Sequence, residues 1–118
     1  MSIKRIQGGA RMSQAVVHAG TVYVAGQVAP PASGETTVAG QTKVILQQID
    51  ALLAEAGTSK ENILSATIWL ADMATFDQMN SVWDKWVASG NTPARATVEA
   101  KLAGKAYLVE IAVIAAVA

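Results

Sequence analysis

The chain has 118 residues, enough for one domain with its own hydrophobic core. Apolar residues make up 52% of the sequence and charged residues only 15%, so the chain is not of the disordered class. The formal net charge is zero and the nine basic residues are scattered, which argues against a nucleic-acid partner or an anionic membrane surface. We predict a single domain over residues 1–118.

Cysteine is absent, which excludes disulfides, thiolate metal sites and cysteine nucleophiles. The single histidine, His18, excludes a histidine-rich metal site as well. Residues 1–13 contain no apolar segment of the kind found in signal peptides. The longest apolar run, residues 108–118, contains Glu110 and is about half as long as a bilayer span. We therefore expect a soluble, cytoplasmic protein without a metal or a membrane partner.

In chain order, the first predicted feature is a β-hairpin. Residues 15–18 and 21–25 are rich in strand-forming residues, and Ala19-Gly20 between them suits a tight turn. Residues 3–6 can add an earlier strand. Residues 29–34 contain two prolines and a glycine, which predicts a loop.

A long amphipathic helix is predicted next, over residues 38–56. Gly57 suits the position that ends it, because glycine adopts the left-handed backbone conformation without strain. The residues spaced for its buried face are Ile45, Leu46, Ile49, Leu52, Leu53 and Ala56. Residues 63–71 are rich in strand formers and predict a strand.

A second helix is predicted to begin with a capping box and to run to about Ser89. In this box Thr75 is the capping residue and Gln78, three residues later, reaches back to it. Gly90 can end the helix. Its apolar stripe consists of Phe76, Met79, Val82, Trp83, Trp86 and Val87.

Two final strands are predicted over residues 94–101 and 107–117, joined by a short turn at residues 103–105. The order is βββαβαββ, which is an α+β fold. Each helix joins strands on either side of it, so part of the sheet is expected to be parallel, with right-handed crossovers. Two amphipathic helices can cover one face of such a mixed sheet and leave the other face uncovered.

The last predicted strand is apolar on both of its faces. One face carries Val109, Ile111, Val113 and Val117, and the other carries Leu108, Ala112, Ile114 and Ala116. A strand of this kind is usually buried on both sides. Since the helices cover only one face, we expect a second copy of the chain to cover the other in a closed homo-oligomer.

Two charged residues stand out in the last two strands. Alternation places Arg95 and Thr97 on one face, and the planar guanidinium of Arg95 can bind a carboxylate through two parallel hydrogen bonds. Glu110 lies in an otherwise apolar run, across the short turn. A structural ion pair between Arg95 and Glu110 and a binding site for a small anion are about equally compatible with these residue types.

The other polar and aromatic candidates have ordinary structural interpretations. Asn80 on the second helix suits a surface or capping group, and Thr97 suits a β-branched strand residue. His18 has no acidic motif beside it and is interpreted as a plain strand residue. The three tryptophans are interpreted as core or interface anchors.

Four segments carry a resemblance to a known family. They are GQVA (residues 26–29), Asn80, PARATVEA (residues 93–100) and VEIAVIA (residues 109–115). In this order and spacing, over nearly its whole length, the chain resembles the reactive intermediate deaminase family, Rid, also called YjgF. The resemblance implies a chorismate-mutase-like α+β fold and a homotrimer, with a barrel-like core and clefts between neighbouring subunits.

The resemblance also implies an activity. Rid deaminases hydrolyse enamine and 2-imino acid intermediates, such as 2-aminoacrylate, 2-iminobutanoate and 2-iminopropanoate, to the 2-keto acid and ammonia, and need no cofactor. By this resemblance Arg95 would bind the substrate carboxylate and Glu110 would position the attacking water. Asn80, Thr97 and the Gly26-Gln27 segment would line the cleft and bind substrate.

Three positions depart from the family pattern. Thr97 stands where many members have cysteine, Ala25 where deaminase members have serine, and residues 11–14 lack the tyrosine that helps close the cleft. These departures leave a second function open, that of a non-catalytic binding protein for a carboxylate metabolite. A ribonuclease is disfavoured by the zero net charge, and the high apolar content leaves a chaperone-like holdase open.

Overall fold

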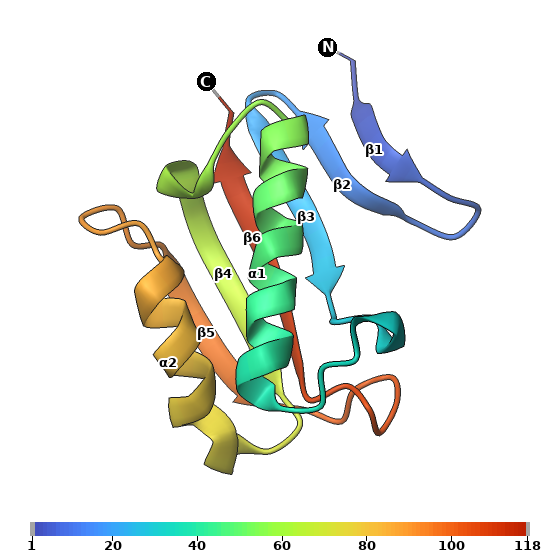
Figure 1. The fold of residues 1–118 in the computed structure, drawn as a ribbon. Coiled ribbons are helices and arrows are strands. Elements are labelled where there is room, and N and C mark those ends of the chain that lie inside the picture. Colours follow the sequence, from blue (N-terminus) through green and yellow to red (C-terminus); the bar gives the residue numbers. More distant parts are fainter. Residues whose placement is uncertain (1, 118) are drawn as a thin grey trace.

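The computed structural model describes residues 2–117, which form a six-stranded sheet with two α-helices on one of its faces (Figure 1). The strand order is β1-β2-β3-β6-β4-β5. The strands are β1 Lys4–Gly8, β2 Ser13–His18, β3 Thr21–Gln27, β4 Ile63–Leu70, β5 Ala94–Glu99 and β6 Val109–Ala116. The helices are α1 Val38–Glu55 and α2 Phe76–Trp86. This is the βββαβαββ order, of the α+β class, that the sequence predicts.

The first three strands form an antiparallel meander at one edge of the sheet. β1 pairs with β2, and β2 pairs with β3. The turn between β2 and β3 has positive φ at both central residues, 52° at Ala19 and 79° at Gly20. This geometry suits a two-residue hairpin because its twist matches that of the flanking strands. The predicted hairpin is confirmed, and β2 begins two residues earlier than expected.

Each α-helix connects two parallel strands. α2 joins β4 to β5, which pair in parallel. α1 joins β3 to β4, and these two strands flank β6, which runs antiparallel to both of them. The sheet is therefore mixed, as the order of the elements predicts.

The last two strands are not neighbours, because β4 lies between β5 and β6. The chain passes the end of β4 before β6 enters the sheet between β3 and β4. The predicted short turn at residues 103–105 is wrong for this reason, since the connection spans residues 100–108. A turn in which Tyr107 N donates to Gly104 O at 3.1 Å lies within this connection.

Helix α1 begins and ends close to the predicted residues. The Thr37 hydroxyl accepts a hydrogen bond from Gly40 N at 3.0 Å, which caps the first turn. At the other end Gly57 has a φ of 88°, and Thr58 N donates to Leu53 O at 2.9 Å. This is the Schellman pattern, so the stop predicted at Gly57 is confirmed.

The beginning of α2 differs from the prediction. Met73–Thr75 form a 3₁₀ turn that runs into the helix, and Thr75 makes no side-chain cap bond to it. The Asp72 carboxylate instead accepts from Ala74 N at 2.9 Å. The predicted capping box at Thr75 and Gln78 is wrong because the backbone turns before Thr75, whose hydroxyl donates back to Asp72 O at 2.6 Å.

The end of α2 also comes earlier than predicted, at Trp86 rather than near Ser89. Val87 leaves the helix with a ψ of 141°. The Trp86 carbonyl oxygen accepts a hydrogen bond from Lys60 Nζ at 2.6 Å. A lysine from the segment before β4 thus satisfies one of the carbonyl groups that a helix end leaves without a partner.

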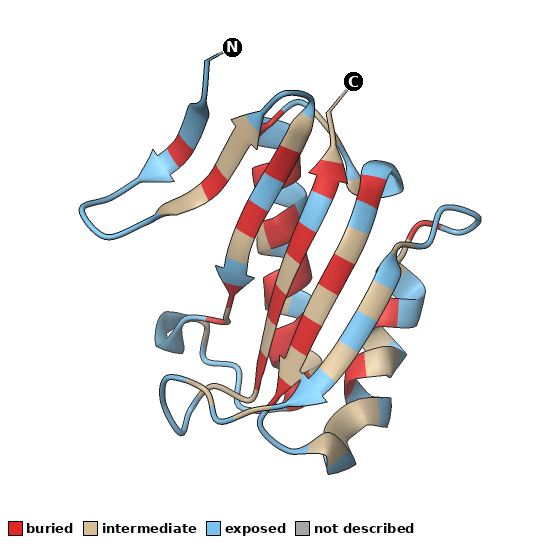
Figure 2. Ribbon diagram, turned by 180° about the vertical axis from the view of Figure 1, so that it is seen from behind, coloured by how far each residue is buried: buried red, intermediate tan, exposed pale blue. Residues whose placement is uncertain are grey.

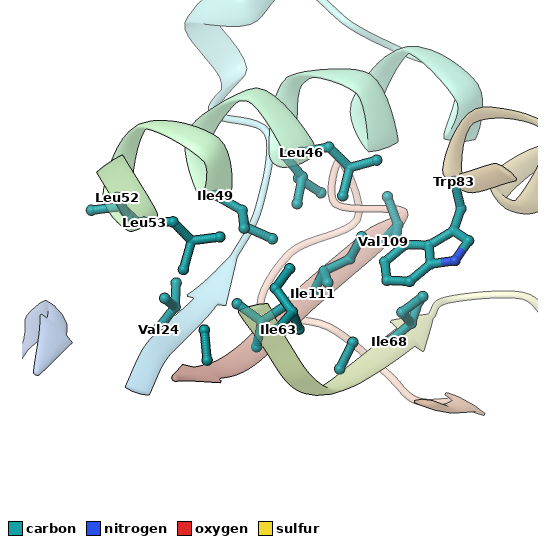
Figure 3. Packing of buried hydrophobic residues seen from close by; sticks show 14 of the residues in the cluster. Val24, Leu46, Ile49, Leu52, Leu53, Ile63, Ile68, Trp83, Val109 and Ile111 are labelled. Carbon is teal, nitrogen blue, oxygen red and sulfur yellow. The ribbon is translucent and has the colours of Figure 1, made fainter. Parts of the chain in front are cut away.

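The hydrophobic core lies between the two α-helices and one face of the sheet (Figure 3). Alternate residues of β6 face the helices and are buried: Val109, Ile111, Val113 and Ala115. The helices contribute Leu46, Ile49 and Leu53 from α1 and Trp83 from α2 to the same cluster. Burial of these apolar side chains helps to hold the helices on the sheet.

The opposite face of the sheet is uncovered in a single chain (Figure 2). Tyr23 is 49% exposed, Val98 44% and Ile114 37%, although each is a large apolar side chain. The register places Tyr23 beside Ile114 on neighbouring strands. Exposed apolar side chains gathered on ordered strands indicate an interface, which agrees with the homo-oligomer expected from the sequence.

We expect Ile114→Lys to dissociate this oligomer. The new ammonium lies in the middle of the uncovered face, where it cannot be buried without a partner. Multi-angle light scattering should give the wild type a mass of about three times the 12.2 kDa of one chain, and the variant the mass of one chain. Gln78→Lys adds the same charge on the exposed surface of α2 and should leave the mass unchanged. A wild type that is monomeric at micromolar concentration contradicts the prediction.

Candidate functional site

The candidate site residues lie on both faces of the sheet. Arg95 is opposite Ala66, which is buried under the helices, so Arg95 and Thr97 both face α2. Glu110 is opposite Trp69 and faces the uncovered side. The alternation predicted from the sequence is therefore present in both strands, but it directs the cation and the carboxylate to different sides.

This register excludes one of the two interpretations of the charges. An ion pair between Arg95 and Glu110 needs both side chains on one face, on strands that are close together. They lie on opposite faces, and β4 separates their strands. Within one chain the structural ion pair is therefore wrong, and the anion site stays a prediction for Arg95.

Helix α2 holds the Arg95 guanidinium. Arg95 Nη1 donates to Asn80 Oδ1 at 2.8 Å. The guanidinium carbon lies 5.2 Å from the centroid of the Trp83 ring and 5.8 Å from that of Phe76, both within cation–π range. Phe76, Asn80 and Trp83 are four and three residues apart, so they share one face of the helix. The sequence pattern predicted a ligand contact for Asn80 and a place in the core for the two aromatic residues. The spacing of the three residues along the helix is the signal that connects them.

Thr97 lies two residues from Arg95 on the same face of β5. Its Oγ1 atom is buried and has no hydrogen-bond partner among residues 2–117. A buried hydroxyl without a partner costs about 1–3 kcal/mol. The hydroxyl is therefore an unused hydrogen-bonding group close to the one cation of the strand.

Glu110 on the other face lies directly over Gly26. β3 contains a bulge between Val24 and Gln27, so Ala25 and Gly26 together oppose a single residue of β6. A Cβ atom at position 26 would overlap the Glu110 carboxylate. The absence of a side chain at this position therefore lets the carboxylate approach the backbone of β3.

Gln27 points away from Glu110, into a network of amide side chains. Gln27 is only 6% exposed, and its Nε2 donates to Gln14 Oε1 at 2.9 Å and to Ala25 O at 3.1 Å. Its Oε1 accepts from Gln48 Nε2 at 3.2 Å. Both N–H groups of the Gln27 side-chain amide already donate hydrogen bonds. If the Gly26-Gln27 segment contacts a ligand, the contact therefore has to come from its backbone.

A hollow of about 520 Å³ opens beside Gly26. Its lining includes Met12, Gln14 and Gln27. Met12 is 48% exposed and belongs to residues 11–14, the segment that lacks an aromatic residue. The space next to Gly26 is therefore open to solvent in a single chain.

Two classes of feature are not found in the part of the chain that the structure describes. Residues 2–117 contain no cluster of three histidine, cysteine or acidic side chains arranged to hold a metal ion. Over the same residues, neither α-helix combines the length and the apolarity that a membrane crossing requires.

Comparison with known proteins places the chain in a family. A family model described as endoribonuclease L-PSP matches residues 2–117. A RutC family protein of Haemophilus influenzae is 49% identical over 115 residues, which cover 98% of each chain. A crystal structure of a YjgF family member from Neisseria meningitidis superposes with a TM-score of 0.95 at 43% identity, covering 100% of this chain and 97% of the other. The chain belongs to the Rid/YjgF family.

The same family assignment follows from further relatives. The RutC family protein YoaB of Escherichia coli is 44% identical over 117 residues, which cover 99% of this chain and 100% of YoaB. A Yersinia pestis protein described as a conserved Rid family member of unknown function superposes with a TM-score of 0.89 at 33% identity, covering 98% of this chain and 100% of the other. The resemblance seen in the sequence motifs and the YjgF-type fold are therefore both confirmed for this Rid/YjgF protein.

Gly26→Ala tests the contact between β3 and Glu110. The added methyl overlaps the carboxylate, so a crystal structure of the variant should show Glu110 in a different rotamer. The free energy of unfolding should fall by less than about 1 kcal/mol, since the glutamate side chain can rotate away.

Glu110→Ala provides the matched background for this test. It removes the atoms that the methyl overlaps, so adding Gly26→Ala to it should cost no stability in a urea titration. An equal loss in both backgrounds would show that something other than Glu110 excludes a side chain at position 26.

Proposed function

We propose that this Rid/YjgF protein hydrolyses 2-imino acids, and the enamines in equilibrium with them, to 2-keto acids and ammonia. The observation that carries the proposal is the Arg95 guanidinium, held by Asn80 and two aromatic rings with no carboxylate paired to it among residues 2–117. A fixed cation of this kind suits the carboxylate that every 2-imino acid carries. Family membership supports the same class of activity.

The proposed site needs more than one subunit. Arg95 and Glu110 face opposite sides of the sheet, so a single chain does not bring them to one ligand. The uncovered face that carries Glu110 is also the face expected to meet another copy. We propose a homotrimer in which each cleft combines Arg95, Asn80 and Thr97 of one subunit with Gly26 and Glu110 of its neighbour.

The chemistry requires few groups. The protonated imine carbon is already electrophilic, and Arg95 fixes the substrate through its carboxylate. Glu110 orients a water molecule and accepts one of its protons as the oxygen attacks that carbon. The resulting tetrahedral adduct has one hydroxyl and one amino group. Glu110 returns this proton to the nitrogen, and the C–N bond breaks as the hydroxyl gives its own proton to the Glu110 carboxylate and its oxygen becomes the carbonyl of the 2-keto acid. Ammonia leaves in this step, and Glu110 afterwards releases its proton to solvent.

Thr97 would supply a hydrogen bond that the empty site lacks. Its buried hydroxyl has no partner within residues 2–117, and it faces the same side as Arg95. In the proposed cleft it donates to the substrate carboxylate or to the adduct. The hydroxyl therefore takes the place of the thiol that many family members have at this position.

Two observations favour a second function, the binding of a carboxylate metabolite without turnover. Ala25, in the bulge of β3, has no hydroxyl, and Met12 is exposed in residues 11–14, the segment in which deaminase members have a tyrosine. In this case Arg95 still binds the carboxylate, but the cleft neither closes nor holds the water. Thermal stabilisation by 2-ketobutyrate without turnover of the imino acid would identify this function.

Arg95→Ala tests the proposed activity directly. An amino-acid oxidase generates the imino acid in place, and semicarbazide traps what the protein has not hydrolysed. Losing the carboxylate anchor should cost about 2–5 kcal/mol, so kcat/KM should fall roughly 30- to several-thousand-fold. Arg5→Ala removes an exposed arginine from β1 and should leave the rate unchanged. If the wild-type protein hydrolyses the imino acid no faster than buffer alone, the proposed activity is wrong.

Thr97→Val separates ligand binding from folding. Replacing an unpartnered buried hydroxyl by a methyl of the same shape should leave the free energy of unfolding unchanged or raise it. The Kd for 2-ketobutyrate should nevertheless rise about 10- to 150-fold, because the ligand carboxylate loses a hydrogen bond from the hydroxyl. Isothermal titration calorimetry and urea unfolding measure the two effects. Unchanged affinity would remove Thr97 from the proposed cleft.

A further inference from the structure

We propose that Trp83 is a positioning residue of the Arg95 site. Its indole ring, fixed by Trp86 and Asp50, holds the Arg95 guanidinium in the orientation that binds a carboxylate. The inference rests on the proposed role of Arg95 as the carboxylate anchor. It changes the interpretation of Trp83 from a core residue to one that also acts on the ligand, through the arginine.

Trp83 is itself rigidly held. It is 5% exposed and lies at the end of the core that α2 covers (Figure 3). The Trp86 ring packs against it, with centroids 5.3 Å apart and an interplanar angle of 53°. Tilted aromatic pairs at this distance are favourable.

Trp86 is anchored in turn to the other helix. Its Nε1 donates to Asp50 Oδ2 of α1 at 3.0 Å. The Lys60 ammonium lies 5.4 Å from the centroid of the same ring, and Lys60 Nζ also donates to the Trp86 carbonyl oxygen. A continuous line of contacts therefore runs from α1 through Trp86 and Trp83 to the guanidinium of β5. We call Asp50, Trp86 and Trp83 the tryptophan support of Arg95.

The tryptophan support of Arg95 holds the guanidinium without neutralising its charge, which an acidic partner would do. A guanidinium has five N–H donors, and Arg95 donates only one hydrogen bond within residues 2–117, to Asn80. An aspartate or glutamate in the place of Trp83 would fix the arginine but would neutralise it and occupy its planar fork. Aromatic rings attract the cation without accepting its strong hydrogen bonds. The charge and the remaining donors therefore stay available for a ligand carboxylate.

Trp83→Leu tests the proposal, because it keeps an apolar side chain in the core but removes the ring. We expect the Kd for 2-ketobutyrate and the KM for the imino acid to rise together, about 3- to 30-fold. The value of kcat should change less than about threefold, since the water and Glu110 are untouched. Trp83→Tyr retains a ring and should recover most of the affinity.

Two further variants separate positioning from packing. Met79→Leu alters a side chain of α2 that is 0% exposed and should leave Kd unchanged, whatever it does to stability. Trp86→Phe keeps a ring against Trp83 but loses the hydrogen bond to Asp50, so Kd should rise by a smaller factor than in Trp83→Leu. If Trp83→Leu does not fold, Trp83→Met replaces it, because the flexible methionine fills the same space without a ring.

A readout that needs no ligand completes the test. In an NMR spectrum, the chemical shift of the Arg95 Nε–H group should change in Trp83→Leu, because the guanidinium no longer packs on the ring. In Trp83→Tyr this chemical shift should return toward the wild-type value. If the wild type neither binds nor turns over its substrate, the proposed function fails, and this resonance alone then decides the positioning role. The proposal is wrong if a folded Trp83→Leu or Trp83→Met protein binds 2-ketobutyrate with the same Kd as the wild type. It is also wrong if the Arg95 resonance does not shift in such a variant.

Discussion

Side chains of a strand alternate between the two faces of a sheet, and here α1 and α2 cover only one of those faces. The buried residues of β6 build the core on the covered side, and its other residues are left exposed or half-buried. Arg95 faces the covered side under α2, whereas Glu110 faces the bare side. The fold of a single chain therefore separates the two charged groups, and a second copy has to reunite them if one ligand meets both.

Much of the fold could be predicted from local patterns. The hairpin at Ala19-Gly20 and the helix stop at Gly57 depend on backbone conformations that a few residues determine. The capping box at Thr75 could not be predicted correctly, because Asp72 competes for the same helix end and the motif is ambiguous without coordinates. The insertion of β6 between β3 and β4 was also beyond local reasoning, since strand order depends on contacts between distant segments.

The candidate site shows the same limit. Alternation correctly grouped Arg95 with Thr97, and the family motifs drew attention to Glu110 and Asn80. Neither pattern could say that β4 separates the charges or that they face opposite sides. The contact of Arg95 with Trp83 also required coordinates, because a tryptophan in an apolar stripe has the same spacing whether it fills the core or supports a cation. Residues that act through another side chain leave a weaker signal than those that carry the charge.

The bulge in β3 brings Gly26 directly under the Glu110 carboxylate. Position 26 admits only glycine while Glu110 occupies the space above it. Ala25 lies in the same bulge, and Met12 lines the hollow that opens beside Gly26. In the proposed cleft, substitutions at these two positions would change the surroundings of a ligand while the carboxylate and its glycine stay in place. Specificity in such a cleft would depend on residues other than the carboxylate proposed to hold the water.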